Sequence, residues 1–349
     1  MAIASVEVVP YALPFKEPYV TARGTLERRE MVLLRLRDED GVEGLGEAVP
    51  LTLRGGATLG QVVDELAAWG ERARETRNPW GPAQMSRPAL CAVRTAQLDL
   101  AARGAGGPLF WLFQTPGDPQ PIRCNATLTA AEPVHVAQQA LAWAADGFQA
   151  FKLKVGTAAD TETVGLVRDA VGSEAELRLD ANGAWSVDEA CGILAELASH
   201  GIKLVEQPVA TLEEMAALRE RSEIPIAADE SVETVGDAQR AYAIEACDYL
   251  SIKLSKVGKV DLEDFEVFPL YVTSALDGPV GIAAAAHAVQ ALRARNSDVG
   301  LAHGLATQRL FSATIAAVEC ELRGDMLHLP EGPGLGVEID EAALAHHRL

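Results

Sequence analysis

The sequence predicts an α/β protein built on a (β/α)8-type barrel, a modified TIM barrel, with a second α+β domain that caps it. The first observation is length, because 349 residues exceed the roughly 250 of a barrel by enough for a domain of about 100 more. The second is a repeat in the middle of the chain, where short apolar runs end in a charged residue at intervals of 26, 26, 23 and 24 residues. One strand-plus-helix unit has this length, and right-handed crossovers close such units into a barrel.

The charged residues that end these runs are Lys154, Asp180, Glu206, Asp229 and Lys253. In a (β/α)8 barrel the carboxyl ends of the strands meet at one mouth, which holds the active site. The repeat therefore predicts a mouth with three carboxylates and two lysines. A single strand-end carboxylate is often only a helix N-cap, but five charged residues at one-unit spacing favour a functional site.

The three carboxylates predict a metal site. Carboxylates that share a water-poor cavity repel one another unless a cation lies between them. Hard oxygen ligands suit Mg2+, for which Mn2+ can substitute, so we expect Asp180, Glu206 and Asp229 to bind one such ion. Lys152 and Lys154 share one face of their strand, and an amine becomes a base near neutral pH when neighbouring positive charge lowers its pKa.

The segments before the barrel also have patterns that predict their structure. Residues 1–50 alternate apolar and polar, which predicts antiparallel strands. Residues 58–105 have a helical pattern, with breaks at Pro82 and Pro88, and the proline-rich stretch 115–121 predicts a linker in front of the barrel. The sequence therefore predicts a capping domain at its start and a barrel after the linker.

Composition excludes several partners. A formal net charge of -20 argues against nucleic acid and anionic membranes, since both select basic surfaces. It does not argue against an anionic substrate, because a buried metal and lysines act locally. No apolar run approaches the roughly 18 residues of a spanning helix, and the first residues lack the features of a leader peptide, which predicts a cytoplasmic enzyme. The five cysteines have no paired-ligand spacing, which indicates reduced thiols.

A set of motifs accompanies the charged strand ends. In the barrel region they are Lys152-Leu-Lys154, Asp180-Ala-Asn182-Gly-Ala-Trp185, Val205-Glu206-Gln207-Pro208, Ala228-Asp229-Glu230-Ser231 and Ile252-Lys253. The flanks add Gly44-Leu-Gly46-Glu47-Ala48 and Gly332-Pro-Gly-Leu-Gly336. Over nearly the whole chain, this set resembles the muconate-lactonizing branch of the enolase superfamily. The resemblance implies an α+β capping domain at 1–121, a barrel at 122–322, and a C-terminal segment, 323–349, that returns to the cap.

The resemblance also implies a mechanism. Such enzymes abstract the proton next to a carboxylate and pass through an enediolate that the metal stabilises. Lys154 would be the base, and Lys152 would help to lower its pKa. Lys253 would hold the anionic intermediate from the opposite face, while Asn182 and Glu230 would support the metal from behind its ligands.

Within that branch, Asn125-Ala126-Thr127 and the run Ser274-Ala-Leu-Asp277 are similar to o-succinylbenzoate synthases. This similarity implies a lyase that eliminates water in menaquinone biosynthesis, with a small carboxylate substrate held by Ser274, Arg23 and Asn125. Two loops, Thr21–Leu26 and Leu51–Gly60, would close over the mouth as lids. The sequence does not determine the oligomeric state, and a homo-oligomer is one of the alternatives.

Other functions compete with this one. An N-acylamino-acid or dipeptide epimerase, or a cycloisomerase, would be an isomerase of the same branch that uses the same lysines. Dipeptide epimerases usually carry an Asp-x-Asp pair at the eighth strand, which 302–306 lacks. The mandelate-racemase branch uses a histidine in place of Lys253. A non-catalytic binding protein on the same fold is the most distant alternative.

One segment departs from the expected pattern. Between Gly258 and Ser274 the chain is about one helical turn shorter than a crossover helix and its next strand require. We therefore predict a short or irregular sixth helix. Gly258-Lys259 also stands where the branch commonly has two glycines, which affects the geometry just after Lys253.

Overall fold

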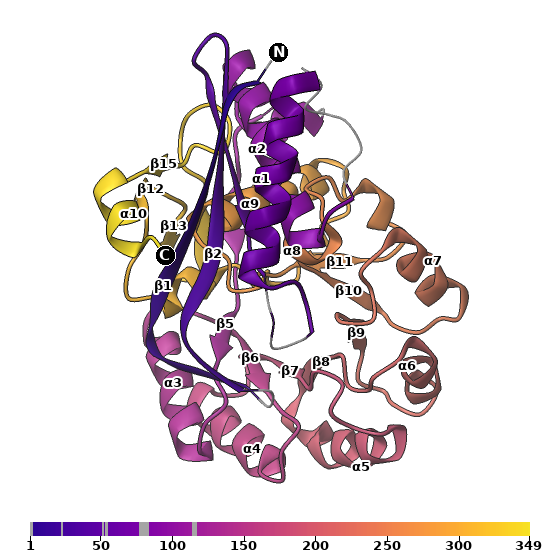
Figure 1. The fold of residues 1–349 in the computed structure, drawn as a ribbon. Helices are drawn as coiled ribbons and strands as arrows, with labels where there is room; N and C mark the ends of the chain where they lie inside the picture. Colours follow the sequence, from indigo (N-terminus) through magenta and orange to yellow (C-terminus); the bar gives the residue numbers. More distant parts are fainter. Residues whose placement is uncertain (1–2, 22–23, 51, 53–54, 77–83, 114–116) are drawn as a thin grey trace.

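The computed structural model describes residues 3–21, 24–50, 52, 55–76, 84–113 and 117–349. At its centre is a parallel sheet of seven hydrogen-bonded strands in the order β11-β10-β9-β8-β7-β6-β5. Figure 1 shows helices around this sheet and the long N-terminal strands standing over one end of it. The predicted α/β barrel with a cap is confirmed.

Barrel strands and helices alternate along the chain. The strands are β5 (Ala126–Leu128), β6 (Ala150–Lys154), β7 (Glu176–Asp180), β8 (Ile202–Glu206), β9 (Ile226–Ala228), β10 (Tyr249–Ile252) and β11 (Leu270–Val272). The main helices are α3 (Pro133–Ala145), α4 (Asp160–Val171), α5 (Val187–Leu197), α6 (Leu212–Arg219), α7 (Val235–Ala243) and α9 (Pro279–Ala294). Capping boxes begin α5, α6 and α7, where Ser186, Thr211 and Thr234 accept from the third helical amide and the acid there reaches back.

The barrel closes through a short bridge. His303 pairs with Cys124, and Gly304 pairs with Thr273. Gly304 N donates to Val272 O at 2.9 Å, and Asn125 N donates to His303 O at 2.9 Å. His303 and Gly304 thus occupy the place of the eighth barrel strand and join β11 to the start of β5. Within the described residues they do not form a regular strand.

The sixth crossover is irregular, as predicted. Only the one-turn helix α8 (Leu254–Val257) and a 3-10 turn at Glu263–Phe265 lie between β10 and β11. Gly258 ends α8 with a left-handed φ of 71°, a conformation that glycine adopts without strain. Its neighbour Lys259 forms an ion pair with Asp264.

The N-terminal domain has three antiparallel strands and two helices. The strands are β1 (Ile3–Thr21), β2 (Gly24–Asp38) and β3 (Glu43–Ala48), in the order β1-β2-β3. The helices α1 (Leu59–Thr76) and α2 (Arg87–Ala105) pack on this sheet around a core that includes Leu34, Leu66 and Leu100. The predicted antiparallel strands and helices are both confirmed.

The C-terminal segment returns to the cap. Of the elements after the eighth barrel position, β12 (Ala316–Val318) and most of β13 (Glu321–Arg323) precede residue 323, and β14 (Met326–His328), β15 (Glu338–Ile339) and α10 (Glu341–His347) follow it. β14 pairs with β4 (Ile122–Arg123), so the chain between linker and barrel first joins a small antiparallel sheet. Leu349 N donates to Pro10 O at 3.0 Å, which ties the tail to β1. The boundaries at 121 and 322 stay predictions.

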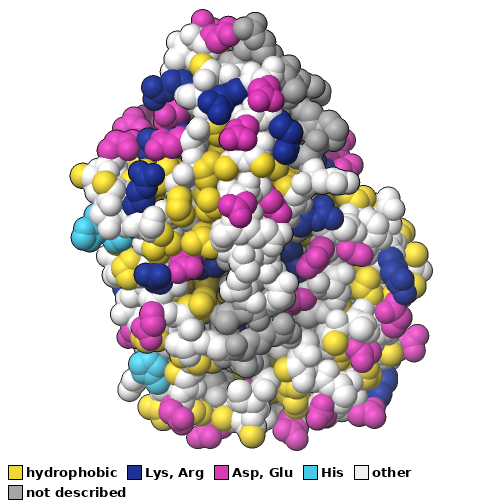
Figure 2. Space-filling view, in the orientation of Figure 1, with side chains coloured by type: hydrophobic (Ala, Val, Ile, Leu, Met, Phe, Trp, Pro, Cys, Tyr) yellow, Lys and Arg dark blue, Asp and Glu magenta, His cyan; other side chains and the backbone are white. Residues whose placement is uncertain are grey.

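The surface reflects the acidic composition. In Figure 2 acidic side chains are spread over the visible face with lysines and arginines between them. None of the helices in the described ranges is long and apolar enough to cross a membrane.

Candidate active site

The strand register brings the charged residues together. The β6–β7 pairing sets Lys154 opposite Asp180, and the β7–β8 pairing sets Asp180 opposite Glu206. Asp229 follows β9 directly, and Lys253 follows β10. The five residues therefore lie in sequence along the carboxyl end of the sheet.

Ammonium groups lie between the carboxylates. Lys152 Nζ is 2.9 Å from both Asp180 Oδ2 and Glu206 Oε1. Lys154 Nζ donates to the same Asp180 oxygen at 2.6 Å. The Asp180 and Glu206 side chains are at most 1% exposed, so these charges interact with little screening by water.

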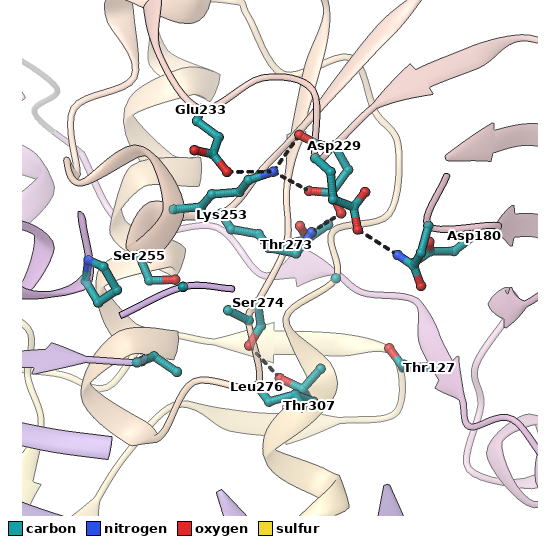
Figure 3. Close-up of a pocket in the computed structure, with 18 of the residues that line it drawn as sticks. Thr127, Asp180, Asp229, Glu233, Lys253, Ser255, Thr273, Ser274, Leu276 and Thr307 are labelled. Atoms are coloured by element: carbon teal, nitrogen blue, oxygen red, sulfur yellow. Dashed lines mark hydrogen bonds and ion pairs between the residues drawn. The ribbon is translucent and has the colours of Figure 1, made fainter. Parts of the chain in front are cut away.

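Lys253 completes the arrangement on the other side. Its ammonium donates to Asp229 Oδ2 and lies 3.9 Å from Glu206 Oε1. Asp229 is buried, and Figure 3 shows it beside Lys253, with Asp180 close by. Lysines thus contact all three carboxylates.

The pKa values follow from these contacts. Burial would lower the pKa of Lys152, but the carboxylates of Asp180 and Glu206 outweigh it and raise the pKa well above its ordinary value. Burial also opposes the charge of Lys253, whose pKa is raised by Asp229 and Glu206. Burial would raise the pKa of Asp180, but Lys152 and Lys154 hold it far below its usual range. These contacts favour the charged forms of Lys152, Lys253 and Asp180.

Asn182 and Glu230 connect to the lysine on β6. Lys154 Nζ donates to Asn182 Oδ1 at 2.9 Å, and Asn182 Nδ2 donates to Glu230 Oε1 at 2.9 Å. Asn182 has a left-handed φ of 49°, which asparagine tolerates better than most residues. The backbone after β7 therefore turns this amide toward the lysine.

The donor set fits a hard divalent cation. Three buried carboxylates face one region, and Asp180 Oδ1 is buried without a hydrogen-bond partner among the described residues. Within those residues, no three acidic, histidine or cysteine side chains are grouped closely enough to hold a metal as they stand. The lysine contacts explain this, because the ammonium groups lie where they neutralise the carboxylates.

A pocket of about 630 Å3 opens over these groups. Its barrel side includes Lys154, Asp180 and Lys253, and its capping-domain side includes Tyr19 and Val49. Figure 3 shows Ser274, Leu276 and Thr307 away from the carboxylates, with Ser274 and Thr307 joined by a hydrogen bond of 2.8 Å. The pocket thus lies between the two domains.

The predicted substrate contacts have different outcomes. Ser274 lines the pocket. Asn125 is fully buried, its amide donates to Ala126 O, and it is not among the described residues of the pocket wall. Arg23 lies outside the described residues. Parts of both predicted lids also lie outside them, but Leu26 and Gly56 line the pocket.

Sequence reasoning missed several residues of the site. Lys256, in α8, lines the pocket and donates to Asp229 O at 2.8 Å; burial lowers its pKa. Its spacing of three from Lys253 was the available signal. Thr127 and Thr307 also line the pocket; Thr127 belongs to the quoted motif Asn125-Ala126-Thr127 but was not assigned a role, and nothing in the local sequence distinguishes Thr307.

Tyr271, from β11, was also missed. Its hydroxyl donates to Glu206 Oε2 at 2.7 Å, and both side chains are fully buried. The guanidinium of Arg178 lies 5.1 Å from the centre of the tyrosine ring, a cation–π distance. Burial and the nearby Glu206 raise the pKa of Tyr271 well above its ordinary value, so the phenol stays a donor. Glu206 therefore has a different partner on each oxygen.

Two family models match the chain. Residues 135–343 match one described as enolase C-terminal domain-like. Residues 3–113 match the N-terminal domain of mandelate racemase / muconate lactonizing enzyme.

Individual proteins agree with these matches. A hydrophobic dipeptide epimerase from Enterococcus faecalis is 30% identical over an alignment of 361 positions that covers 97% of this chain and 99% of that protein. An o-succinylbenzoate synthase from Thermobifida fusca is 33% identical over 288 residues, covering 78% of this chain and 82% of that one. The crystal structure of the E. faecalis epimerase with Mg and L-Leu-L-Tyr superimposes with a TM-score of 0.87 at 28% identity, covering 97% and 100% of the two chains. This chain is therefore an enzyme of the enolase superfamily and belongs to its muconate-lactonizing branch.

Proposed function

We propose that this enzyme is an o-succinylbenzoate synthase, a lyase that eliminates water from a cyclohexadiene diacid. The observation that carries the proposal is the uncharged wall opposite the carboxylates. The described residues that form it on β11, the following turn and the eighth position are Thr273, Ser274, Ala275, Leu276, Gly304 and Thr307. The ammonium of a dipeptide would find no carboxylate on that wall, and an unpaired charge is costly to desolvate.

The charges around the pocket also favour an anion. Among its described lining residues, the cationic ones are Lys152, Lys154, Lys253, Lys256 and Arg87, and the acidic ones are Asp180, Asp229, Glu230 and Glu233. A bound divalent cation would add two more positive charges. A doubly negative diacid compensates such a site better than a zwitterionic dipeptide does.

The residues divide the chemistry between them. Asp180, Glu206 and Asp229 would hold Mg2+, with Mn2+ as a substitute, and the ion when bound supplies a Lewis acid that makes the α-proton of the substrate more acidic. Lys154 takes that proton and then gives it to the leaving β-hydroxyl, which departs as water. Lys253, from the opposite side, balances the negative charge that develops between the two steps. Lys152 stays charged and holds Asp180 and Glu206 in position.

An epimerase is the second candidate, because the E. faecalis dipeptide epimerase is similar over nearly its full length. In that reaction Lys154 and Lys253 would act as acid and base on opposite faces of one carbon. A cycloisomerase would use the same lysines on a muconate. The three proposed reactions differ in the part of the substrate that occupies the pocket beyond the reacting carboxylate.

The test compares substrates under one set of conditions. Purified enzyme with Mg2+ receives the cyclohexadiene precursor of o-succinylbenzoate, muconate, and a panel of dipeptides and N-acylamino acids in D2O. We expect rapid loss of the diene absorbance with little deuterium incorporation in the panel. Efficient racemization of a panel member, or muconate turnover, without dehydration would overturn the assignment.

A further inference from the structure

The capping domain reaches the wall of the pocket through a buried carboxylate. Glu47, in β3, is 2% exposed. Its Oε1 accepts from Gly278 N at 2.6 Å, and its Oε2 accepts from Tyr11 OH at 2.8 Å. Gly278 is the N-cap of α9 and has no side chain to cap it. A carboxyl group from another domain therefore supplies a hydrogen-bond acceptor at the N-terminus of this 16-residue helix.

A second buried side chain holds the same segment three residues earlier. Arg29, in β2, is 4% exposed. Its Nη2 donates to Ala275 O at 3.2 Å, and its Nη1 donates to Pro50 O. The backbone from Ala275 to Gly278 is therefore bonded at both ends to side chains of the capping domain.

The segment between these contacts is strained and lines the pocket. Leu276 has φ of 65°, a strained conformation for a bulky side chain, which persists only where the surroundings enforce it. Leu276, Ser274 and Ala275 all line the pocket. Asp277 accepts from Ser274 Oγ at 2.7 Å, which links the hydroxyl on the wall to the backbone that the cap holds.

Two glycines allow the close approach. A Cβ on Gly278 would overlap with the hydroxyl of Tyr11, and a Cβ on Gly281 would lie 2.7 Å from Glu47 Oε1. A side chain at either position would push the capping domain away from α9.

We propose that Glu47 and Arg29 are positioning residues, through which the capping domain fixes the pocket wall Ser274–Asp277 and so sets the fit of the substrate. Their action does not depend on the lid loops, since both lie in regular strands. The effect on substrate fit rests on the proposed function, whereas the effect on the wall itself does not.

The first experiment is hydrogen exchange of the backbone amides from Ala275 to Gly281, of which only Pro279 has no N–H. In Glu47→Ala, exchange should be about tenfold faster or more, because the cap of Gly278 N is lost. Glu47→Gln should restore protection, since its amide oxygen still accepts from Gly278 N and its NH2 can donate to Tyr11. If Glu47→Ala does not fold, Glu47→Asp, which shortens the acceptor, takes its place.

Asp99 provides the matched control. It is fully buried and also ties the cap to a distant segment, since it accepts from Leu45 N at 2.8 Å and Leu335 N at 2.6 Å. It has no bond to the wall. Asp99→Ala should leave exchange of Ala275–Gly281 unchanged even if it lowers stability. Equal acceleration in both variants, or none in Glu47→Ala, overturns the proposal.

Kinetics then test the fit. With whichever substrate the wild-type enzyme turns over, Glu47→Ala should raise KM about tenfold and change kcat less, and Glu47→Gln should restore KM. Asp99→Ala should change neither. An unchanged KM in Glu47→Ala overturns the role in substrate fit. If the enzyme does not turn over the proposed substrate, the hydrogen-exchange experiment still tests whether Glu47 fixes the wall.

Discussion

A single buried hydroxyl, that of Tyr271, bears on how tightly the proposed metal is held. Removing a group that hydrogen-bonds to a metal-binding side chain typically lowers the metal affinity by about 10–100-fold. Tyr271→Phe should therefore weaken Mn2+ binding by about that factor, because Glu206 loses its 2.7 Å partner and can turn away from the site. Titration of Mn2+ followed by electron paramagnetic resonance measures this without any substrate.

Tyr11→Phe is the control for that change. It removes a similar buried bond, 2.8 Å long, to Glu47, away from the three carboxylates. Its Mn2+ affinity should match that of the wild type. A loss of equal size in both variants would show that Tyr271 acts only through general stability.

The two lysines should be separable by isotope exchange. Lys154→Ala and Lys253→Ala should both abolish turnover, because base and opposing charge act on one intermediate. With a slow substrate analogue in D2O, Lys253→Ala should retain exchange of the α-proton and Lys154→Ala should not. Loss of exchange in the Lys253 variant alone would reverse the roles.

At this scale, what the sequence predicted depended on spacing. Lys154, Asp180 and Glu206 were expected to lie together because equally spaced residues in successive parallel strands lie at the same level along the barrel axis. The observed strand register agrees. Tyr271 was not predicted, because an aromatic residue in a short apolar run has the pattern of an ordinary core residue. Its role depends on facing the barrel interior, which three residues of strand do not reveal.

Among the elements, the contact of α2 with β3 depends on glycine. A Cβ on Gly46 would overlap with the carbonyl of Ala92 and lie 3.0 Å from Ala96 Cβ. Gly46→Ala should therefore lower the free energy of unfolding by about 1–3 kcal/mol through overpacking. Gly104→Ala, in the last turn of α2 with nothing near its Cβ position, should instead raise it by about 0.4–1 kcal/mol. Urea unfolding of both variants checks the pair, and a stabilised Gly46→Ala would contradict this packing.

Element-scale predictions succeeded where local sequence controls the structure. The irregular sixth crossover followed from chain length alone. The bridge at His303 and Gly304 and the pairing of β4 with β14 were not predicted, since both depend on partners far away in the chain. The same is true of Glu47, whose motif was recognisable but whose partner Gly278 is 231 residues away.

For the whole molecule, Glu47 predicts a pH dependence of stability. Burial, and then the nearby Asp277, raise the pKa of Glu47 from 4.5 to about 7 in the folded protein. Between these values the folded state binds the extra proton, so the free energy of unfolding should fall as pH rises from 4.5 to 7, by up to roughly 3 kcal/mol.

Glu47→Gln isolates this contribution, because the amide does not titrate. The difference in unfolding free energy between wild type and variant should shift in favour of the variant across that pH window. Denaturant unfolding at pH 4.5, 6 and 7.5 measures it. A difference that does not change with pH would mean that Glu47 titrates at its ordinary pKa.

The tie between the tail and β1 has a consequence for synthesis on the ribosome. Residues 341–349, which complete the cap against β1, are translated only after every strand of the barrel. A nascent chain can therefore expose a finished barrel while its first domain still lacks a neighbour. The lysines and carboxylates of the mouth can therefore come together before the tail has completed the capping domain that covers them.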